Sequence, residues 1–198
     1  METTTPTTPA TTSTTTTREL LVEQLDWHWT HQLRARLASL SDDEYLWEPT
    51  PGAWNLHPRG QGTTEFQGGS GELTIDWAYP EPSPAPVTTI AWRLAHVIVG
   101  VLGARVHGHF GGPEADYLTW DYSGTAQGAL TQLDEAYAAW LSGLRTWSDA
   151  DLLEPCGPAE GPWQDTARGV LVLHINREVI HHGAEIALLR DLWAHRAD

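Results

Sequence analysis

Lysine is absent from this sequence, and cysteine occurs only once. All 11 basic residues of the 198-residue chain are arginines. Without lysine, the chain cannot form a Walker phosphate-binding loop, a Schiff-base lysine or a Ser-x-x-Lys nucleophile pair. With Cys156 as its single cysteine, it can form neither an intrachain disulfide nor a zinc site built from a cysteine cluster.

Positive charge and long apolar runs are also scarce. The formal net charge is −15, from 26 acidic and 11 basic residues, which argues against nucleic-acid binding because phosphates require facing cations. No uninterrupted apolar run approaches the ~20 residues of a membrane span, and the N-terminus lacks the apolar core of a secretory signal. We therefore expect a cytoplasmic protein with neither a membrane nor a nucleic-acid partner. Its arginine-only basic residues indicate a GC-rich genome.

The beginning of the chain is rich in threonine. Residues 3–17 contain 11 threonines and two prolines and no large apolar side chain. Such a segment cannot bury enough surface to offset the entropy lost when it becomes ordered. We expect residues 1–17 to form a disordered tail and residues 18–198 to form one domain.

Four long segments show helical periodicity, with an apolar residue about once per turn. They run over residues 18–40, 88–107, 125–147 and 166–194. Thr16 and Glu19 form the pattern of a capping box before the first segment, and Asp165 is the expected cap of the fourth. The pattern predicts an all-α four-helix bundle with long connections between the helices.

The connection of residues 41–87 is the longest between the predicted helices. Its residues 60–71 include five glycines. Further on, the apolar residues of 73–79 alternate along the chain, which predicts a short extended segment that forms at most a small hairpin. Connections of this length in a compact domain are usually binding loops or lids.

Ligand-type side chains interrupt the apolar stripes of two predicted helices. Glu178 and His182 lie one turn apart in the middle of an apolar helix face, where burying a carboxylate is costly unless something compensates. His96 lies in the apolar run of residues 94–99. If the two helices face one another, His96, Glu178 and His182 form a three-ligand set with an open position, which is typical of catalytic zinc. The same set suits iron or nickel.

Ordinary structural roles are open for the same residues. His96 can be a hydrogen-bonded histidine of the core, and Glu178 can form a simple helix ion pair with Arg177 or His181. The run of His174, Glu178, His181 and His182 can also be a solvated helix face. A rival histidine pair, His107 and His109, stands near glycines at the end of the second predicted helix. Its position indicates an exposed helix terminus rather than a metal site.

Three motifs carry a resemblance to a known family. They are Thr89–His96 (TIAWRLAH), His174–Gly183 (HINREVIHHG) followed by Arg190–Leu192 (RDL), and Pro51–Trp54 (PGAW) followed by Leu56–Gly60 (LHPRG). Through them, from about residue 18 to 194, the sequence resembles the DinB-like superfamily of metal-binding four-helix bundles, which includes mycothiol-dependent maleylpyruvate isomerase and bacterial thiol S-transferases. Many members have histidine where this chain has Glu178, and the glutamate form is similar to the isomerase branch. The resemblance implies that His96, Glu178 and His182 are the metal ligands.

The resemblance also implies a small thiol as co-substrate, and the GC-rich composition favours mycothiol over bacillithiol. A divalent metal with an open position can hold a thiol as thiolate, which is the nucleophile of sulfur chemistry. We therefore expect a thiol-dependent S-transferase or isomerase that acts on an electrophilic small molecule, with zinc favoured over nickel or iron. Glu185, one turn beyond His182, is a candidate to assist the thiolate. Cys156 is not needed and is interpreted as incidental.

Two other functions are compatible with the same ligands. The first is a metal-dependent hydrolase that uses metal-bound water with Glu185 as base, and the second is a non-enzymatic metal-binding or stress protein. For the substrate pocket we nominate Trp54, His57, Arg59 and Arg93. The resemblance and the 11 tryptophans also favour a homodimer.

Overall fold

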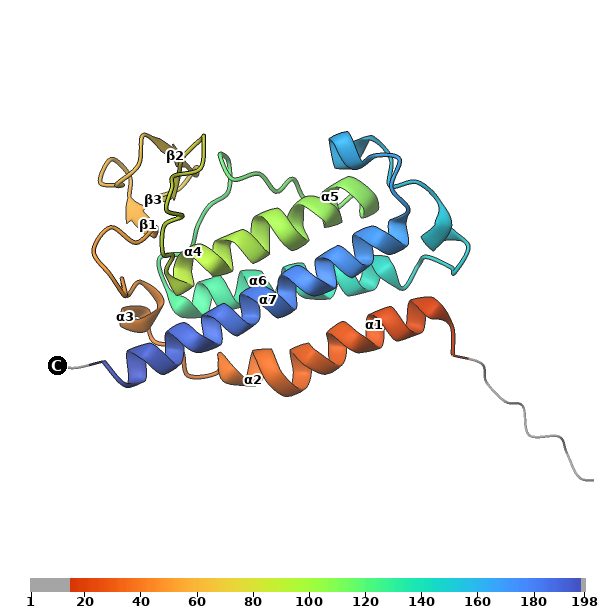
Figure 1. Cartoon of the computed structure of the whole chain (residues 1–198), viewed down its shortest axis with the longest axis horizontal. Coiled ribbons are helices and arrows are strands. Elements are labelled where there is room, and N and C mark those ends of the chain that lie inside the picture. The colour runs from red at the N-terminus through yellow and green to blue at the C-terminus, as the bar shows by residue number, and fades with distance from the viewer. Residues whose placement is uncertain (1–14, 197–198) are drawn as a thin grey trace, which may run out of the picture.

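Four long helical segments lie side by side and make up most of the molecule (Figure 1). The computed structural model describes residues 15–196. The segments are α1 (Thr17–His28) continued by η1 (Trp29–Leu33) and α2 (Arg34–Arg36); α4 (Ile90–Ala95) continued by η2 (His96–Gly103) and α5 (Ala104–Phe110); α6 (Ala126–Leu144); and α7 (Arg168–Ala194). The stretches η1 and η2 are π-helical. The helical periodicity predicted for all four segments is confirmed, with ends that shift by a few residues.

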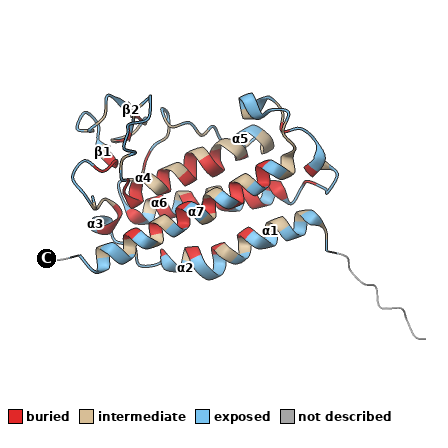
Figure 2. Ribbon diagram, in the orientation of Figure 1, coloured by how far each residue is buried: buried red, intermediate tan, exposed pale blue. Residues whose placement is uncertain are grey.

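The core fills the space between these segments. Leu25, Ile98, Trp140 and Ile175, one from each segment, are all buried, and Figure 2 shows the buried parts of the helices facing one another. α6 packs along η2, and α1 packs along α7. Burial of a large apolar side chain contributes ~1.5–3 kcal/mol relative to exposure. The packing therefore holds η2 and α7 at fixed positions, and these two elements carry the candidate ligands.

The segment Ile90–Phe110 is long and apolar enough to cross a membrane by length and composition. Its position in the fold gives another reason for this composition, since 61% of its most apolar window is buried inside the molecule. A helix that is apolar on most of its faces is expected at the centre of a domain.

The first helix begins within the segment expected to be disordered. Thr17 is its first residue, and Thr16 is its N-cap. The Thr16 side chain accepts a hydrogen bond from the Glu19 backbone, and the Glu19 carboxylate accepts one from the Thr16 backbone at 2.9 Å. The capping box is therefore confirmed. Residues 1–14, the rest of the predicted tail, lie outside the described residues.

The prediction that Asp165 caps α7 is wrong. In the described structure the N-cap of α7 is Ala167, and its side chain makes no capping hydrogen bond. The residues before α7 are paired with an earlier loop: the backbone N–H of Cys156 donates to Thr166, and that of Arg168 donates to Glu154. This pairing holds the chain extended past Asp165 and delays the start of the helix.

The long connection between α2 and α4 contains a sheet that exceeds the predicted hairpin. This connection begins with the short helix α3 (Asp42–Tyr45) and continues with three strands, β1 (Leu56–Pro58), β2 (Phe66–Gly68) and β3 (Leu73–Trp77). The strands form one antiparallel sheet in the order β1-β3-β2. The fold is therefore mostly helical but not all-α.

A buried carboxylate explains why two further segments join β3. The side chain of Asp76 is fully buried and accepts hydrogen bonds from His57 Nε2 at 2.8 Å and from the Thr63 backbone at 3.0 Å. It also accepts one from the backbone N–H of Asn55. These donors precede β2 in the chain, so satisfying the carboxylate requires all of these segments to gather around β3.

Two lobes rise above the same side of the helices (Figure 1). The sheet lobe, residues 54–88, lies over α4. The loop lobe, residues 148–167, lies near α5 and contains η3 (Asp151–Leu153) and η4 (Pro158–Trp163). The middle of the segment 90–110 and the facing part of α7 lie between the two lobes.

Candidate metal centre

His96, Glu178 and His182 come together between the two lobes. One ligand atom of each lies within 4.8 Å of the others. His182 Nε2 is 3.3 Å from Glu178 Oε2, and the rings of His96 and His182 are perpendicular with centroids 4.7 Å apart. Facing helices bring these residues together, as the sequence predicted: η2 provides one residue, and α7 provides two that are one turn apart.

Burying these three polar side chains among apolar neighbours costs free energy unless a positive charge compensates for it. His182 is only 6% exposed, and its neighbours Val179 and Ile186 on α7 are buried. Besides His182, the carboxylate of Glu178 has two more distant partners: His174 Nδ1 at 3.4 Å and Arg177 Nε at 3.7 Å. Two imidazoles that face one carboxylate at this depth form a donor set that fits a divalent cation.

Each candidate histidine is oriented through its second ring nitrogen. His182 Nδ1 is 2.6 Å from Glu185 Oε2, and the same Glu185 oxygen is 3.1 Å from Arg93 Nε. His96 Nδ1 is 2.6 Å from the hydroxyl of Tyr117. Metal-binding histidines usually have such a partner, which sets the ring orientation and leaves the other nitrogen free for the ligand bond.

The protonation state of His96 suits a ligand. Burial, reinforced by the nearby His182, lowers the pKa of His96 to about 4. Burial also lowers the pKa of His174, whose Nδ1 lies 3.4 Å from the carboxylate of Glu178. Because metal ions bind the neutral imidazole, His96 needs to lose no proton before it coordinates at neutral pH.

The local backbone at His96 is unusual. η2 is a π-helical stretch that begins at this residue, and such stretches are frequent at functional sites. A Cβ at Gly100 on the same stretch would collide with the Tyr117 hydroxyl. The absent side chain therefore makes room for the tyrosine that contacts His96.

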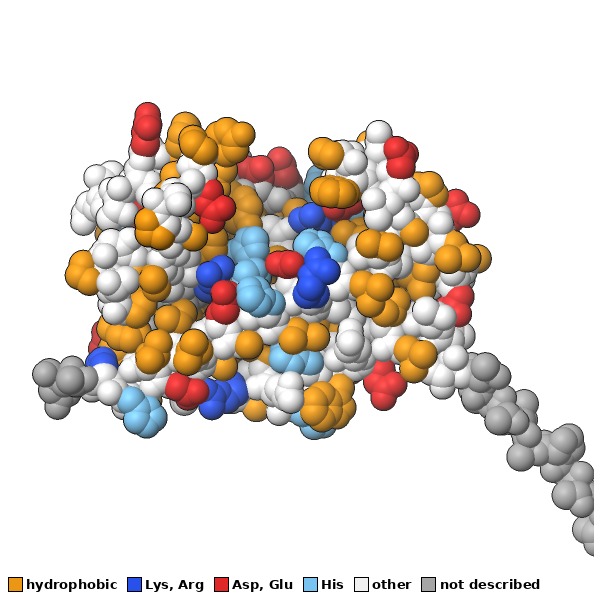
Figure 3. Space-filling view, in the orientation of Figure 1, with side chains coloured by type: hydrophobic (Ala, Val, Ile, Leu, Met, Phe, Trp, Pro, Cys, Tyr) orange, Lys and Arg blue, Asp and Glu red, His pale blue; other side chains and the backbone are white. Residues whose placement is uncertain are grey.

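Three adjoining cavities form a cleft around this group. The central cavity, of about 430 Å³, is lined by residues that include His96, Arg105, Tyr117, His174 and Glu178. The aromatic cavity, of about 380 Å³, is lined by Phe66, Gly68, Ile75, Trp77, Trp92, His96, Asp116, Tyr117 and Leu118. The arginine cavity, of about 330 Å³, is lined by Arg105, Cys156, Glu160, Trp163, Thr166, Val170, Leu171, His174 and Arg177. Figure 3 shows histidine, acidic and basic side chains gathered in the hollow between the two lobes.

Three of the four nominated pocket residues belong to the sheet lobe, and one of them, Trp54, also contacts Trp92 of α4, with ring centroids 5.8 Å apart. Trp54 is buried and pairs with Thr88. His57 is held by Asp76, and Arg59 donates hydrogen bonds to the carbonyls of Gly69 and Gly71. None of the three is among the described residues that line the cleft.

The fourth nominated residue, Arg93, lies next to the candidate ligands. It pairs with Glu185 and lies 5.3 Å from the centre of the Trp92 ring. Arg93 is not among the described residues that line the three cavities. It supports His182 instead, because it pairs with Glu185, which contacts the His182 ring.

The rival histidine pair of residues 107 and 109 lies near the end of α5, and His107 is exposed there as predicted, whereas His109 is not. The His109 side chain is buried rather than exposed, and its Nε2 lies 2.9 Å from Glu160 Oε1. Glu160 also pairs with Arg105. His107 contacts the backbone carbonyl of Gly112.

A second group of ligand-type residues, His181, His182 and Glu185, also has atoms within 4.8 Å. It shares His182 with the first group, and its Glu185 already contacts His182 Nδ1. We interpret this group as the outer support of the first one.

Sequence reasoning missed Tyr117, Asp116 and Arg105, which all line the central cavity. Tyr117 and Asp116 belong to the connection between α5 and α6, where no periodic pattern marks a functional residue. Arg105 offered one signal, since it is one of only two arginines, with Arg93, in the apolar segment Ile90–Phe110.

The comparison with known proteins agrees with this architecture. The profile of the DinB superfamily matches residues 64–186, which is more than half of the chain and includes His96, Glu178 and His182. This range is narrower than residues 18–194, over which the sequence motifs resemble the family. No curated protein and no solved structure matches the chain significantly. The mostly helical fold and the matched range together show that the chain belongs to the DinB superfamily.

Proposed function

We propose that this protein is a metal-dependent S-transferase or isomerase, built on a four-helix bundle, that uses a small thiol to act on an electrophilic small molecule. Mycothiol is the thiol that we favour. The observation that carries the proposal is the convergence of His96, Glu178 and His182, with ligand atoms within 4.8 Å, at a cleft large enough for two small molecules. Membership of the DinB superfamily supports the metal.

The donor set fits a divalent metal. Two imidazoles and one carboxylate suit zinc, which we favour, and also nickel or iron. Three protein ligands leave a coordination position open. A divalent cation bound there supplies Lewis acidity, which lowers the pKa of a small thiol so that the thiolate exists at neutral pH.

Residues of the chain hold this arrangement in place. Glu185 and Tyr117 orient the rings of His182 and His96, and Arg93 in turn holds Glu185. Because both rings are fixed before any ligand arrives, little conformational freedom is lost when the metal binds.

The sulfur nucleophile is expected to come from outside the chain. Burial raises the pKa of the Cys156 thiol, the only thiol of the protein. A buried thiol with a raised pKa is a poor nucleophile. This supports a small-molecule thiol over an enzyme thiol as the reacting group.

The thiol sulfur forms a bond to carbon of the electrophile in both proposed reactions. In transfer, the thiol sulfur supplies the electron pair of the new carbon–sulfur bond, its proton passes to solvent, and the leaving group departs with its own bonding pair. In isomerisation, the sulfur adds to the substrate and is later expelled, so the product contains the same atoms as the substrate.

Two alternatives rank below this proposal. Hydrolysis with Glu185 as base is less favoured because that carboxylate is already occupied by His182 Nδ1 and Arg93. A non-enzymatic metal-binding role requires no substrate, whereas the cleft offers cavities of small-molecule size. We further propose a cytoplasmic location, no nucleic-acid or membrane partner, and a homodimer as the assembly to test first.

The test measures product formation from a generic alkylating electrophile by the zinc-loaded protein. Reactions contain mycothiol, bacillithiol, glutathione or no thiol. We expect a rate that requires one thiol and disappears in His182→Ala. The control is His195→Ala, which changes an exposed histidine directly after α7 and should keep the rate. Product formed equally without thiol would favour hydrolysis. No product with any thiol would favour the non-enzymatic role.

A further inference from the structure

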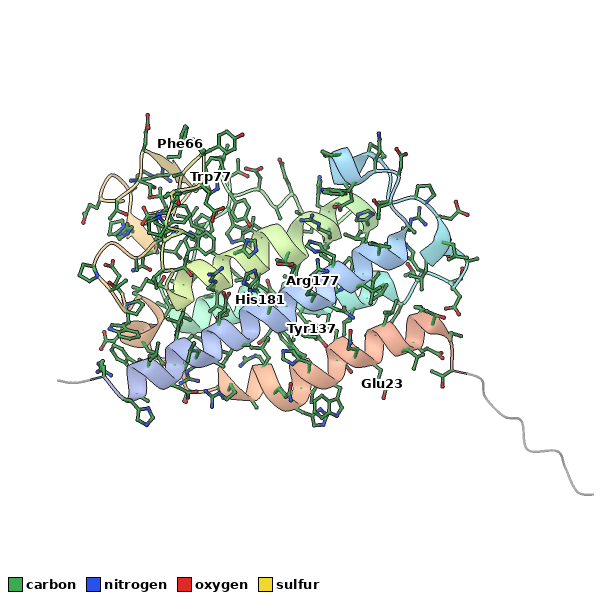
Figure 4. All side chains as sticks on the ribbon, in the orientation of Figure 1. Glu23, Phe66, Trp77, Tyr137, Arg177 and His181 are labelled. Carbon is green, nitrogen blue, oxygen red and sulfur yellow. The ribbon has the colours of Figure 1, made fainter. Side chains whose placement is uncertain are left out.

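A group of aromatic side chains surrounds the aromatic cavity, between the sheet lobe and α4. Phe66 and Trp77, labelled in Figure 4, lie on the sheet lobe at its outer side. They are 49% and 46% exposed, and their rings meet edge to face with centroids 5.8 Å apart. Leu118, also exposed, lines the same cavity. Large apolar side chains that are exposed together commonly mark a binding site.

The inner wall of the aromatic cavity is a row of nearly parallel rings. Trp92 is stacked against His96 with centroids 5.7 Å apart and planes inclined by 15°. His96 is in turn aligned with Tyr117, with centroids 6.3 Å apart and planes inclined by 5°. Flat rings pack best against such walls by offset stacking or edge contacts.

The walls of the aromatic cavity are fixed by backbone contacts. The backbone N–H of Gly69 donates to the Leu118 carbonyl at 3.0 Å, which joins the sheet lobe to the loop that carries Tyr117. A Cβ at Gly68 would collide with the Tyr117 carbonyl, so the missing side chain permits this close approach. The indole N–H of Trp92 donates to the Asp76 carbonyl at 2.8 Å and ties the lobe to α4. The aromatic cavity is therefore preformed.

Size and charge narrow the class of ligand. A volume of about 380 Å³ lies within the range of small-molecule pockets, roughly 300–1,000 Å³. Among the described residues that line the aromatic cavity none is an arginine, and Asp116 contributes a negative charge. An anionic group is therefore unfavourable there, whereas an uncharged flat ring system finds apolar contacts on several sides.

We propose that the aromatic cavity binds the flat, uncharged aromatic body of the electrophile. This inference rests on the proposed function, and it assigns a substrate class to it. The aromatic cavity shares His96, Asp116 and Tyr117 with the central cavity. A ligand that fills the aromatic cavity thus lies against one candidate metal ligand, close to where the sulfur would react.

The test measures binding directly, without turnover. Isothermal titration calorimetry with the full chain uses 2-naphthol as the probe and 2-naphthalenesulfonate as the anionic control, in zinc-loaded and in chelated protein. We expect saturable 1:1 binding of 2-naphthol in both forms of the protein and much weaker binding of the sulfonate. Because no reaction is required, absence of thiol-dependent turnover would leave this result intact, so the two proposals fail independently.

Variants locate the binding site of the probe. Trp77→Ala and Leu118→Asp change exposed side chains of the aromatic cavity, and each is expected to weaken 2-naphthol binding about tenfold. Trp27→Ala removes an exposed tryptophan on α1 and serves as the matched control, with unchanged binding. The proposal is overturned if 2-naphthol does not saturate, if Trp77→Ala and Leu118→Asp bind like wild type, or if tetramethylammonium binds in preference to 2-naphthol.

Discussion

His182 and Glu185 contact one another across one turn of α7, with His182 Nδ1 2.6 Å from Glu185 Oε2. The opposite nitrogen of the same ring, Nε2, lies 3.3 Å from Glu178 Oε2. The Glu185 carboxylate therefore orients the imidazole through Nδ1, and Glu178 lies at Nε2, the nitrogen that would bind a metal. The two glutamates therefore contact opposite nitrogens of one ring, Glu185 as its orienting partner and Glu178 as a candidate ligand beside it.

Removal of the carboxylate behind His182 should weaken metal binding without abolishing it. We expect Glu185→Ala to lower zinc affinity by about 10- to 100-fold, as loss of an outer partner of a ligating histidine does. Competition with a chromophoric chelator measures this affinity. Glu135→Ala, at an exposed position of α6, is the control and should bind zinc like wild type. An unchanged affinity in Glu185→Ala would show that Glu185 does not support the metal.

The Tyr117 hydroxyl should matter for His96 more than for folding. Tyr117→Phe removes the group that lies 2.6 Å from His96 Nδ1, and we expect zinc affinity to fall by about tenfold or more. Because one hydrogen bond contributes about 1 kcal/mol net, the free energy of unfolding should change little. Gly100→Ala should weaken zinc binding in the same direction, since its Cβ would displace the hydroxyl. Normal zinc affinity in both variants would refute this positioning role.

His57 is expected to act through the stability of the sheet lobe. His57→Ala removes one donor to the buried carboxylate of Asp76, and we expect the free energy of unfolding to fall by about 1–3 kcal/mol. Chemical denaturation measures this loss. Zinc content should stay at the wild-type level, because His57 does not contact the described candidate ligands. Loss of zinc together with normal stability would instead place His57 in the site.

Metal should stabilise the fold measurably. Binding to the folded state alone at 100 times the dissociation constant adds about 2.7 kcal/mol, which for a chain of this size raises the melting temperature by roughly 5–10 °C. Differential scanning calorimetry of chelated and zinc-loaded protein measures the shift. His182→Ala should remove it. An equal shift in wild type and His182→Ala would indicate zinc binding elsewhere in the chain.

The sequence predicted the helices and the candidate ligands because both depend on short-range spacing. A period of 3.6 residues marks a helix, and ligand-type residues such as Glu178 and His182 stand out when they interrupt an apolar stripe one turn apart. His96 could be paired with them because it too lies within an apolar helix. These inferences needed only the assumption that two predicted helices face one another.

Features that depend on tertiary contacts could not be predicted in the same way. The start of α7 is set by pairing of Thr166 with Cys156 rather than by Asp165. The sheet gathers around Asp76 of β3, which accepts hydrogen bonds from the backbones of Asn55 and Thr63, 21 and 13 residues earlier in the chain. Tyr117 contacts His96 from a loop that has no sequence periodicity, so no local pattern could predict this contact.

The central claim is that His96, Glu178 and His182 hold one metal ion, and elemental analysis tests it most directly. Wild type and the control His195→Ala, which changes an exposed histidine directly after α7, should contain about one divalent metal per chain when purified without chelator. His96→Ala and His182→Ala, shown to be folded by circular dichroism, should contain almost none. Metal retained at the wild-type level in both variants would contradict the claim.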